Sequence, residues 1–198
     1  MIRPLRAAVR TGFPGMALAL VWWMLGGALT GVQAQLDERE IDYEAVFKAG
    51  LMRGGSVLNL AGKKIGDEGL QWLLSQGDRI KKVKKLDLRY NKLTEKAGLL
   101  LAATDALPNL KTLELRHNFL MDAGIVRLAG AKGFPALEKL GLSWNEIRDQ
   151  GALALSVTQS FPRLKKLDLR GNFLADSTKT ALKKRLARLK SLKLEARL

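Results

Sequence analysis

Residues 113–124 read LELRHNFLMDAG, and residues 140–151 repeat the pattern as LGLSWNEIRDQG. The two stretches share the frame LxLxxNx(L/I)xxxG and lie 27 residues apart. Residues 86–97 and 167–178 keep the same step with small changes. A short frame that recurs at a fixed period is typical of a solenoid, in which each copy forms one unit stacked on the next. The period therefore predicts the architecture before any single residue is considered.

Each copy begins with two leucines separated by one residue. Leucines at this spacing point to the same face of a short strand, so each copy predicts one strand of a parallel sheet. An asparagine follows the second leucine by three residues and can bond backbone groups of its own and the neighbouring copy. The asparagines that keep this register are Asn91, Asn118, Asn145 and Asn172. We therefore expect a ladder of asparagine side chains beside the sheet.

An acidic residue four positions beyond each register point predicts the start of a helix. A carboxylate there meets the positive end of the helix dipole and accepts bonds from free backbone N–H groups. A small residue two positions later is expected to let the helix approach the sheet, and a leucine four positions further should be buried. The acids are Asp67, Glu95, Asp122, Asp149 and Asp176, and the leucines are Leu73, Leu101, Leu128, Leu155 and Leu182.

The complete frame, LxxLxLxxNxLxxxG, resembles that of the ribonuclease-inhibitor-like class of leucine-rich repeat proteins. The resemblance covers residues 57–194 and is strongest in the two copies quoted above. It implies an α/β fold, a short right-handed horseshoe with parallel strands on the concave face and helices on the convex face. In that family the concave face and its rim usually bind another macromolecule. Five repeats and a terminal strand are few for the class, so we expect a shallow arc.

Residues 1–34 predict a signal peptide or an N-terminal membrane anchor. The stretch between Arg10 and Asp37 carries no charge, and it contains an apolar run followed by small residues ending at Ala34. Such a pattern favours cleavage and export, to the periplasm or outside the cell. Because a bilayer is spanned by about 20 residues, a single-pass anchor is the alternative. Mitochondrial targeting is disfavoured by the scarcity of serine.

The rest of the chain divides into a cap and a repeat domain. Residues 35–56 contain apolar side chains at loosely helical spacing and predict an N-terminal capping segment that covers the first repeat. Residues 57–198 are the predicted repeat domain, and residues 189–194 should form its terminal strand.

Composition argues against catalytic and metal-binding functions. The chain has no cysteine, which excludes thiolate metal sites, and one histidine, which excludes ordinary multi-histidine metal centres. We expect no cofactor. His117 with Glu114 and Ser143 is the nearest approach to a catalytic set, but an open strand face offers no oxyanion donor and no exclusion of water. We therefore do not expect an enzyme.

The register predicts columns of outward-facing side chains across the sheet, whose strands lie about 4.8 Å apart. One column contains Arg89, Arg116 and Arg170, and the next contains Tyr90, His117 and Trp144. Aromatic and arginine side chains dominate the hot spots of protein interfaces. These columns therefore predict a surface that binds a protein partner, whereas a solvated lattice of weak ion pairs is the plainer interpretation.

The net charge of +15 favours an acidic protein, an anionic polymer or a negatively charged membrane surface as partner. Basic residues concentrate where the strands begin, which suggests binding to an anionic surface as an alternative function. This basic edge contains Lys81, Lys82, Lys84, Lys85, Lys165 and Lys166. Nucleic acid is not expected, because the sequence contains no recognition helix or known nucleic-acid module.

Overall fold

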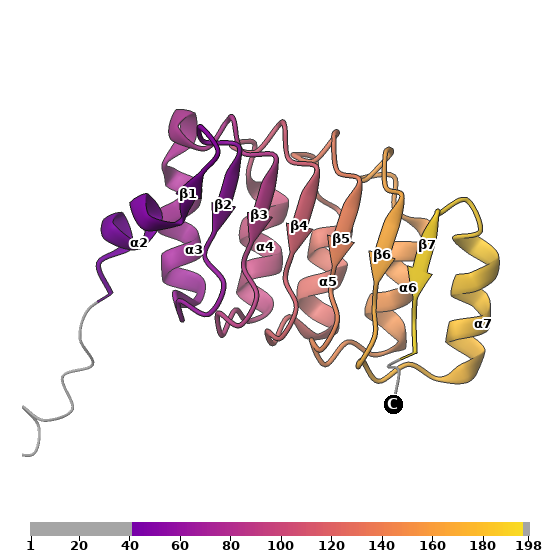
Figure 1. The fold of residues 1–198 in the computed structure, drawn as a ribbon. Coiled ribbons are helices and arrows are strands. Elements are labelled where there is room, and N and C mark those ends of the chain that lie inside the picture. Colours follow the sequence, from indigo (N-terminus) through magenta and orange to yellow (C-terminus); the bar gives the residue numbers. More distant parts are fainter. Residues whose placement is uncertain (1–40, 196–198) are drawn as a thin grey trace, which may run out of the picture. The chain divides into compact units, whose positions relative to one another are not determined.

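A computed structural model describes residues 41–195, in which strands and helices alternate along the chain (Figure 1). The strands are β1 (Leu51–Met52), β2 (Val57–Asn59), β3 (Lys85–Asp87), β4 (Thr112–Glu114), β5 (Lys139–Gly141), β6 (Lys166–Asp168) and β7 (Ser191–Lys193). The helices are α2 (Tyr43–Gly50), α3 (Gly66–Ser75), α4 (Glu95–Ala103), α5 (Met121–Ala129), α6 (Asp149–Val157) and α7 (Asp176–Arg185), with a 3-10 turn η1 (Gly77–Arg79).

The strands form one sheet in the order of the sequence, from β1 to β7. From β2 onward all neighbours are parallel, and equivalent leucines such as Leu86, Leu113 and Leu140 stand side by side. Helices α3 to α7 form a second layer over one face of this sheet (Figure 1). The opposite face, called here the sheet face, has no helix over it. The predicted α/β repeat solenoid and its terminal strand are confirmed.

The first strand was not predicted. β1 pairs antiparallel with β2, because a hairpin reverses the chain between them. Three consecutive residues of this hairpin, Arg53, Gly54 and Gly55, have positive φ angles of 53°, 63° and 85°. Two of them are glycines, which adopt such angles without steric cost. Immediately before β1, the helix α2 buries Phe47 against the core and packs Tyr43 beside it.

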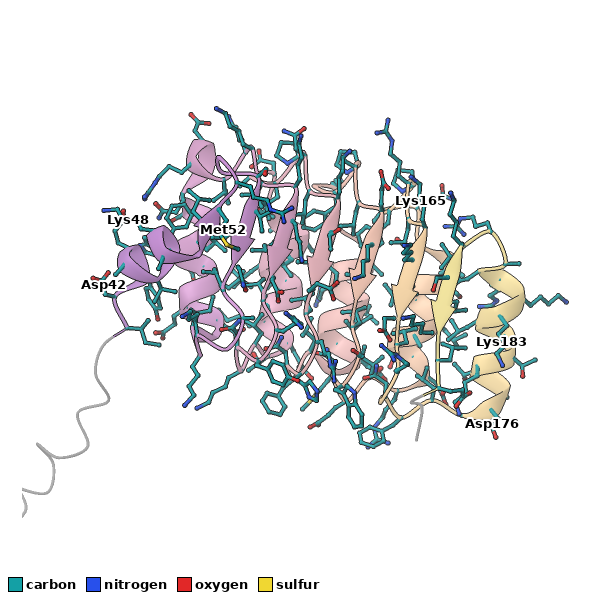
Figure 2. All side chains as sticks on the ribbon, in the orientation of Figure 1. Asp42, Lys48, Met52, Lys165, Asp176 and Lys183 are labelled. Atoms are coloured by element: carbon teal, nitrogen blue, oxygen red, sulfur yellow. The ribbon has the colours of Figure 1, made fainter. Side chains whose placement is uncertain are left out.

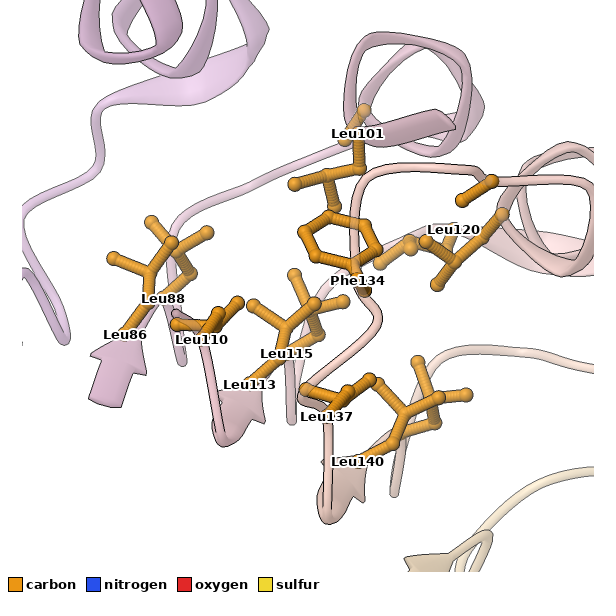
Figure 3. Close-up of a cluster of buried hydrophobic side chains, with 14 of the residues drawn as sticks. Leu86, Leu88, Leu101, Leu110, Leu113, Leu115, Leu120, Phe134, Leu137 and Leu140 are labelled. Atoms are coloured by element: carbon orange, nitrogen blue, oxygen red, sulfur yellow. The ribbon is translucent and has the colours of Figure 1, made fainter. Parts of the chain in front are cut away.

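Leucines from both layers meet in a continuous core (Figure 3). Leu113 and Leu115 point inward from the β4 segment, Leu101 reaches them from α4, and Phe134 fills the space between (Figure 3). Burial of one such side chain contributes roughly 1.5 to 3 kcal/mol. The helix leucines predicted from the frame are all buried: Leu73, Leu101, Leu128, Leu155 and Leu182.

The asparagine ladder is confirmed, and it joins repeats in pairs. The side-chain oxygen of Asn118 accepts bonds from the backbone N–H of Asn91 and Leu93, both at 3.0 Å. Its amide nitrogen donates to the carbonyls of Leu88 at 3.0 Å and Leu115 at 2.8 Å. Each amide thus satisfies polar groups of two coils that packing would otherwise leave without water.

The five acids lie at helix starts, as predicted, but three of them accept hydrogen bonds from the next repeat rather than from their own helix. Asp122 is the second residue of α5, and its carboxylate accepts bonds from the backbone N–H of Arg148 at 2.8 Å and Gly151 at 2.9 Å. Those donors belong to the start of α6. Asp67 and Asp149 likewise accept from the backbone preceding the next helix. Because the acid lies inside its own helix, the nearest free N–H groups are those of the neighbouring coil.

At glycines in this part of the frame the close neighbour is the adjacent helix rather than the sheet, so the predicted approach of helix to sheet is corrected. A Cβ atom added to Gly124 would lie 3.0 Å from the Cα of Glu95 in α4. One added to Gly98 would lie 2.0 Å from the carbonyl oxygen of Gly124. Adjacent helices therefore touch backbone to backbone at these positions.

The predicted signal or anchor in residues 1–34 and the first residues of the capping segment lie outside the described part of the chain. Within residues 41–195, no helix combines the length and apolar character needed to cross a membrane.

Candidate interaction surface

The aromatic column is built on left-handed turns that end the strands. Tyr90, His117 and Trp144 have φ angles of 57°, 53° and 58°, and Gly171 takes the same place in the next repeat with 67°. Bulky residues rarely adopt this conformation, because the side chain crowds the backbone. Backbone bonds to the following coil hold the turns: the N–H of Trp144, for example, donates to the carbonyl of Arg170 at 2.9 Å. The rings are therefore fixed to the ends of the strands.

The three rings stack on one another. The ring centroids of Tyr90 and His117 are 4.4 Å apart with an angle of 15° between the planes, and those of His117 and Trp144 are 5.5 Å apart with 8°. Beyond Trp144 the stack rests on Gly171, where an added Cβ would lie 2.4 Å from the indole. The predicted column is thus a physical stack, and glycine at its end makes room for the last ring.

Two phenylalanines that the sequence reasoning missed extend the stack into a patch. Phe119 and Phe173 each follow a ladder asparagine directly and are 46% and 61% exposed. We call Tyr90, His117, Phe119, Trp144 and Phe173 the aromatic rim. These rings line one hollow of about 490 Å³, together with Lys64, Lys92, Asn118, Glu146 and Gly171. An exposed apolar hollow of this kind is the usual mark of a binding site.

The signal for the missed rings was present in the frame. The position after the asparagine holds Lys92, Phe119, Glu146 and Phe173 in successive repeats. Because charged and aromatic residues alternate at this position, the sequence does not show an aromatic column there. On Phe173, moreover, the guanidinium of Arg148 lies 5.6 Å from the ring centroid, a distance at which a cation attracts an aromatic face.

The sheet face next to the rim contains ion pairs along the strands. Arg89 binds Asp87 at 2.8 Å, and Arg170 binds Asp168 at 2.6 Å, and in each pair the arginine follows the last residue of a strand by two positions. Burial by itself would raise the pKa of Asp168, but hydrogen bonds from the Arg170 side chain and backbone outweigh it and lower that pKa. The carboxylate of Asp168 is therefore ionised at neutral pH, and both carboxylates are bound to their arginines.

The acid between them pairs differently. Glu114 binds Lys139 of the next strand at 2.5 Å, and no acid within residues 41–195 pairs with Arg116. The predicted arginine column thus contains two neutralised arginines and one that is free of a carboxylate. Between Arg116 and Arg170, the equivalent position is held by Ser143, which is buried.

Basic side chains outnumber acids on this face. A shallow hollow of about 640 Å³ is lined by eight basic and three acidic residues, and the three acids are those already paired. Five basic lining residues have no ion pair in the described part of the chain: Lys85, Arg116, Lys166, Lys190 and Lys193. The sheet face therefore presents a positive field that its own acids do not cancel.

His117 connects the two surfaces. Burial within the stack lowers the pKa of its imidazole, and the positive charge of the neighbouring Arg116 lowers it further. The ring is therefore neutral at pH 7. The backbone N–H of His117 donates to the carbonyl of Ser143 at 3.0 Å, but among the described residues no hydrogen bond joins the imidazole to the side chain of Glu114 or Ser143. The carboxylate of Glu114 is bound to Lys139. The described residues also contain no cluster of acidic or histidine side chains able to hold a metal ion.

The predicted basic edge divides into parts. Lys81 pairs with Asp78, and Lys165, at the edge where the strands begin (Figure 2), binds Glu138 at 2.8 Å. Two further lysines of the edge, Lys85 and Lys166, line the hollow of the sheet face instead. Lys82 and Lys84 are exposed. Of the six lysines, two are thus paired with carboxylates, two line the hollow of the sheet face and two are exposed without an ion pair in the described part of the chain.

Comparison with known proteins agrees with the fold. A family model described as a leucine-rich repeat matches residues 135–156, which contain β5 and most of α6. No curated protein matches the chain. With the in-register sheet and the alternating helices, this match supports a leucine-rich repeat protein with an α/β solenoid fold. Assignment to the ribonuclease-inhibitor-like class stays a prediction.

Proposed function

We propose that this chain is a non-catalytic module that binds a protein partner through the aromatic rim and the adjoining arginine column. Leucine-rich repeats suggest a protein-interaction module in general. The observation that carries the proposal is the aromatic rim itself, whose rings share one hollow beside the ends of the strands. Aromatic side chains beside arginines are the combination most enriched at interface hot spots.

The geometry of the rim favours recognition by a preformed surface. Stacked rings on hydrogen-bonded turns have already lost their conformational freedom, so a partner would not bear that ordering cost on binding. Burial of such rings against a partner gains roughly 25 cal/mol for each Å² of apolar area removed from water.

A second function, binding to an anionic polymer or membrane surface, is supported by the uncancelled positive charge on the sheet face. Salt distinguishes the two functions, because exposed charges are screened over about 10 Å at 0.1 M salt while buried rings are not. Steep loss of binding with added salt, together with indifference to Trp144→Ala, would favour the anionic surface. Binding that falls on Trp144→Ala and changes little with salt would favour the rim.

We further propose export, on the basis of the pattern in residues 1–34. Cleavage after Ala34 would make Gln35 the first residue of the mature protein. N-terminal sequencing of the protein isolated from its native cells tests this proposal. A chain that begins at Met1 and sediments with membranes would instead support the anchor.

Crosslinking in native cells, followed by identification of the captured protein, tests the proposed partner directly. The double variant Trp144→Ala, Arg116→Ala should capture less of that partner than the wild type. Val157→Ala is the matched control, because this apolar side chain is 66% exposed at the end of α6 and takes no part in the rim. Full capture by a folded double variant would refute the placement of the site.

A further inference from the structure

The middle of the sheet face contains a gap in two of its columns. Gly141 stands at the end of β5 where the neighbouring strands carry Glu114 and Asp168. Two residues on, Ser143 stands where the other repeats carry arginine. Two successive outward positions of the same repeat therefore hold the smallest side chains of their columns.

The gap is surrounded by positive charge. Arg116 and Arg170 flank Ser143 in the preceding and following repeats, and Lys139 and Lys166 lie beside them in the same hollow. The carboxylate of Glu114 takes the place of a side chain at 141: a Cβ added to Gly141 would lie 2.1 Å from its Oε2. That carboxylate is already bound to Lys139. The gap is thus lined by basic groups in excess of the acids available to them.

Arg116 is the group that the protein leaves unsatisfied. In the repeats on either side of the central strands, the arginine binds the acid two residues before it, at 2.8 Å for Arg89 and 2.6 Å for Arg170. In this repeat the equivalent acid binds Lys139, and the Nε atom of Arg116 is buried without a hydrogen-bond partner. A buried donor left unpaired is costly and calls for an explanation, such as a ligand that completes it.

We propose that this gap is a receptor for an acidic side chain of the protein partner, whose apolar neighbour packs on the aromatic rim. The proposal rests on the proposed protein-binding function and names the chemistry of the segment recognised. A guanidinium binds a carboxylate through two parallel hydrogen bonds, so Arg116 supplies both charge and orientation. The carboxylate of Glu114 occupies the space beside Gly141, so the partner's carboxylate would lie in the hollow that Arg116, Ser143 and Arg170 line.

The two subsites are adjacent along the chain. Arg116 directly precedes His117, and Ser143 directly precedes Trp144. At about 3.3 Å per residue, an extended segment would place its acidic and apolar residues roughly two to four positions apart to fill both subsites. The sheet face continues on either side of the gap, so the segment passes across it and presents a side chain rather than a chain end.

A peptide selection tests the proposal without knowledge of the partner. The purified full-length protein is presented with a random library of decapeptides that end in a carboxamide, so that no terminal carboxylate is available. We expect the selected peptides to carry Asp or Glu near an aromatic or large aliphatic residue. Selection of peptides without acids, or no binder up to millimolar concentration, would overturn the proposal.

Ser143→Arg separates a shaped receptor from a diffuse positive field. This change restores the arginine found in three other repeats, so the frame accommodates it, and it adds a positive charge while filling the gap. We expect affinity for a selected acidic peptide to fall by about tenfold or more despite the added charge, because the space for the carboxylate is lost. Tighter binding of the peptide, or of heparin as an anionic polymer, would favour the diffuse field and overturn the proposal.

Arg116→Gln is expected to lower the affinity for the same peptide by about tenfold, because the charge-assisted hydrogen bonds of the guanidinium are lost. Lys132→Gln is the matched control: it removes the same charge from an exposed position outside the hollow and should change affinity by less than about twofold. If Trp144→Ala abolishes binding while Arg116→Gln and Ser143→Arg do not, the rim stands as a protein-binding site and the acid receptor falls. If none of these variants affects capture of the native partner, the proposed function itself fails.

Discussion

Asn118 shows how a single side chain unites two coils. Its oxygen accepts two backbone N–H groups of the preceding repeat, and its nitrogen donates to one carbonyl in each repeat. The first coil has Lys63 at the corresponding position, and that lysine is exposed. The ladder therefore starts at Asn91, one coil inside the sheet.

Replacement of Asn118 by alanine should lower the free energy of unfolding by about 1 to 3 kcal/mol, because buried N–H and carbonyl groups lose their partners. Urea unfolding followed by circular dichroism measures the change. Asn109→Ala is the control, since the amide of Asn109 is exposed and makes one bond, to the carbonyl of Lys81. Equal effects of the two substitutions would contradict the role given to the ladder.

His117 is the only histidine, so its titration can be followed by NMR without assignment of other imidazoles. We expect a midpoint below the ordinary pKa of 6.5, because burial and the charge of Arg116 disfavour the protonated ring. A midpoint at or above 6.5 would contradict this burial.

The lowered pKa of His117 also predicts a direction for stability. The unfolded chain binds the proton more readily than the folded one, so stability should decrease as pH falls from about 6.5 to the folded pKa and then level off. His117→Gln should remove this part of the pH dependence.

At the scale of single residues, the period was sufficient to predict the columns but not the contacts made by their side chains. Tyr90, His117 and Trp144 were identified because each directly precedes a ladder asparagine. Phe119 and Phe173 were missed because they join the aromatic rim only through the left-handed turn. That turn places the residue after each asparagine beside the ring of the residue before the asparagine. Arg116 has no carboxylate partner because Glu114 pairs with Lys139 instead. The spacing of residues in the sequence does not determine which of these two cations Glu114 binds.

Neighbouring helices α4 and α5 approach each other through glycine. Gly98 of α4 faces the backbone of Gly124 in α5, with no space for a Cβ atom between them. Carboxylates strengthen other junctions, as Asp122 does by accepting N–H groups at the start of α6. The elements of this solenoid are thus joined by backbone contact and polar bonds as well as by leucine packing.

Gly98→Ala should destabilise the protein by about 1 to 3 kcal/mol, because the added methyl group forces α4 away from α5. A thermal melt gives the measurement. Gly130→Ala is the matched control: its Cβ would meet only the carbonyl oxygen of Arg127, at 3.4 Å, and its φ angle is −91°. A Gly98→Ala protein as stable as this control would show that the helices have room to move apart.

Helix starts and strand positions were predictable because acids and leucine pairs recur with the period. The hairpin that forms β1 was not, because it occurs once, ahead of the first repeat, and depends on positive φ angles at Arg53, Gly54 and Gly55. The backbone N–H groups that the acidic side chains bind were wrongly predicted for a related reason. A single repeat suggests a bond within its own helix, whereas the stacked coils place the free N–H groups of the next helix closer.

For the whole repeat domain, β7 covers the edge of the sheet beyond β6. The backbone N–H of Leu169 donates to the carbonyl of Lys193 at 2.8 Å, and Leu192 packs against the core. Without this strand, β6 would present unpaired backbone groups and exposed leucines.

Deletion of residues 189–198 should therefore lower the melting temperature and promote self-association, because solenoids need a terminal unit that shields the last core layer. Light scattering after size-exclusion chromatography measures the oligomer, and a melt measures stability. A truncated protein that remains monomeric and equally stable would show that β7 does not act as a cap. Lys193→Ala, which leaves the strand in place, is the control and should retain the wild-type melting temperature.

The architecture of this domain was accessible from sequence because one local rule, repeated at a fixed step, determines the sheet, the core and the helix layer together. Surface chemistry lacks that redundancy. The residue types at the rim and sheet-face positions change from one repeat to the next, so the contacts of each side chain follow only from three-dimensional geometry. This is why the fold was predicted in detail, and the proposed acid receptor beside Ser143 was not.

The stacked rings on left-handed turns have a consequence for the heat capacity and entropy of binding. A surface whose side chains are already immobile has little disorder left to lose, so association should show a negative heat-capacity change without a large unfavourable entropy. Such a surface also discriminates by shape, since it cannot rearrange to accept a poorly fitting segment. Calorimetry on the wild type and on Gly171→Ala, which displaces the Trp144 indole from its seat, would expose that rigidity as a difference in binding entropy.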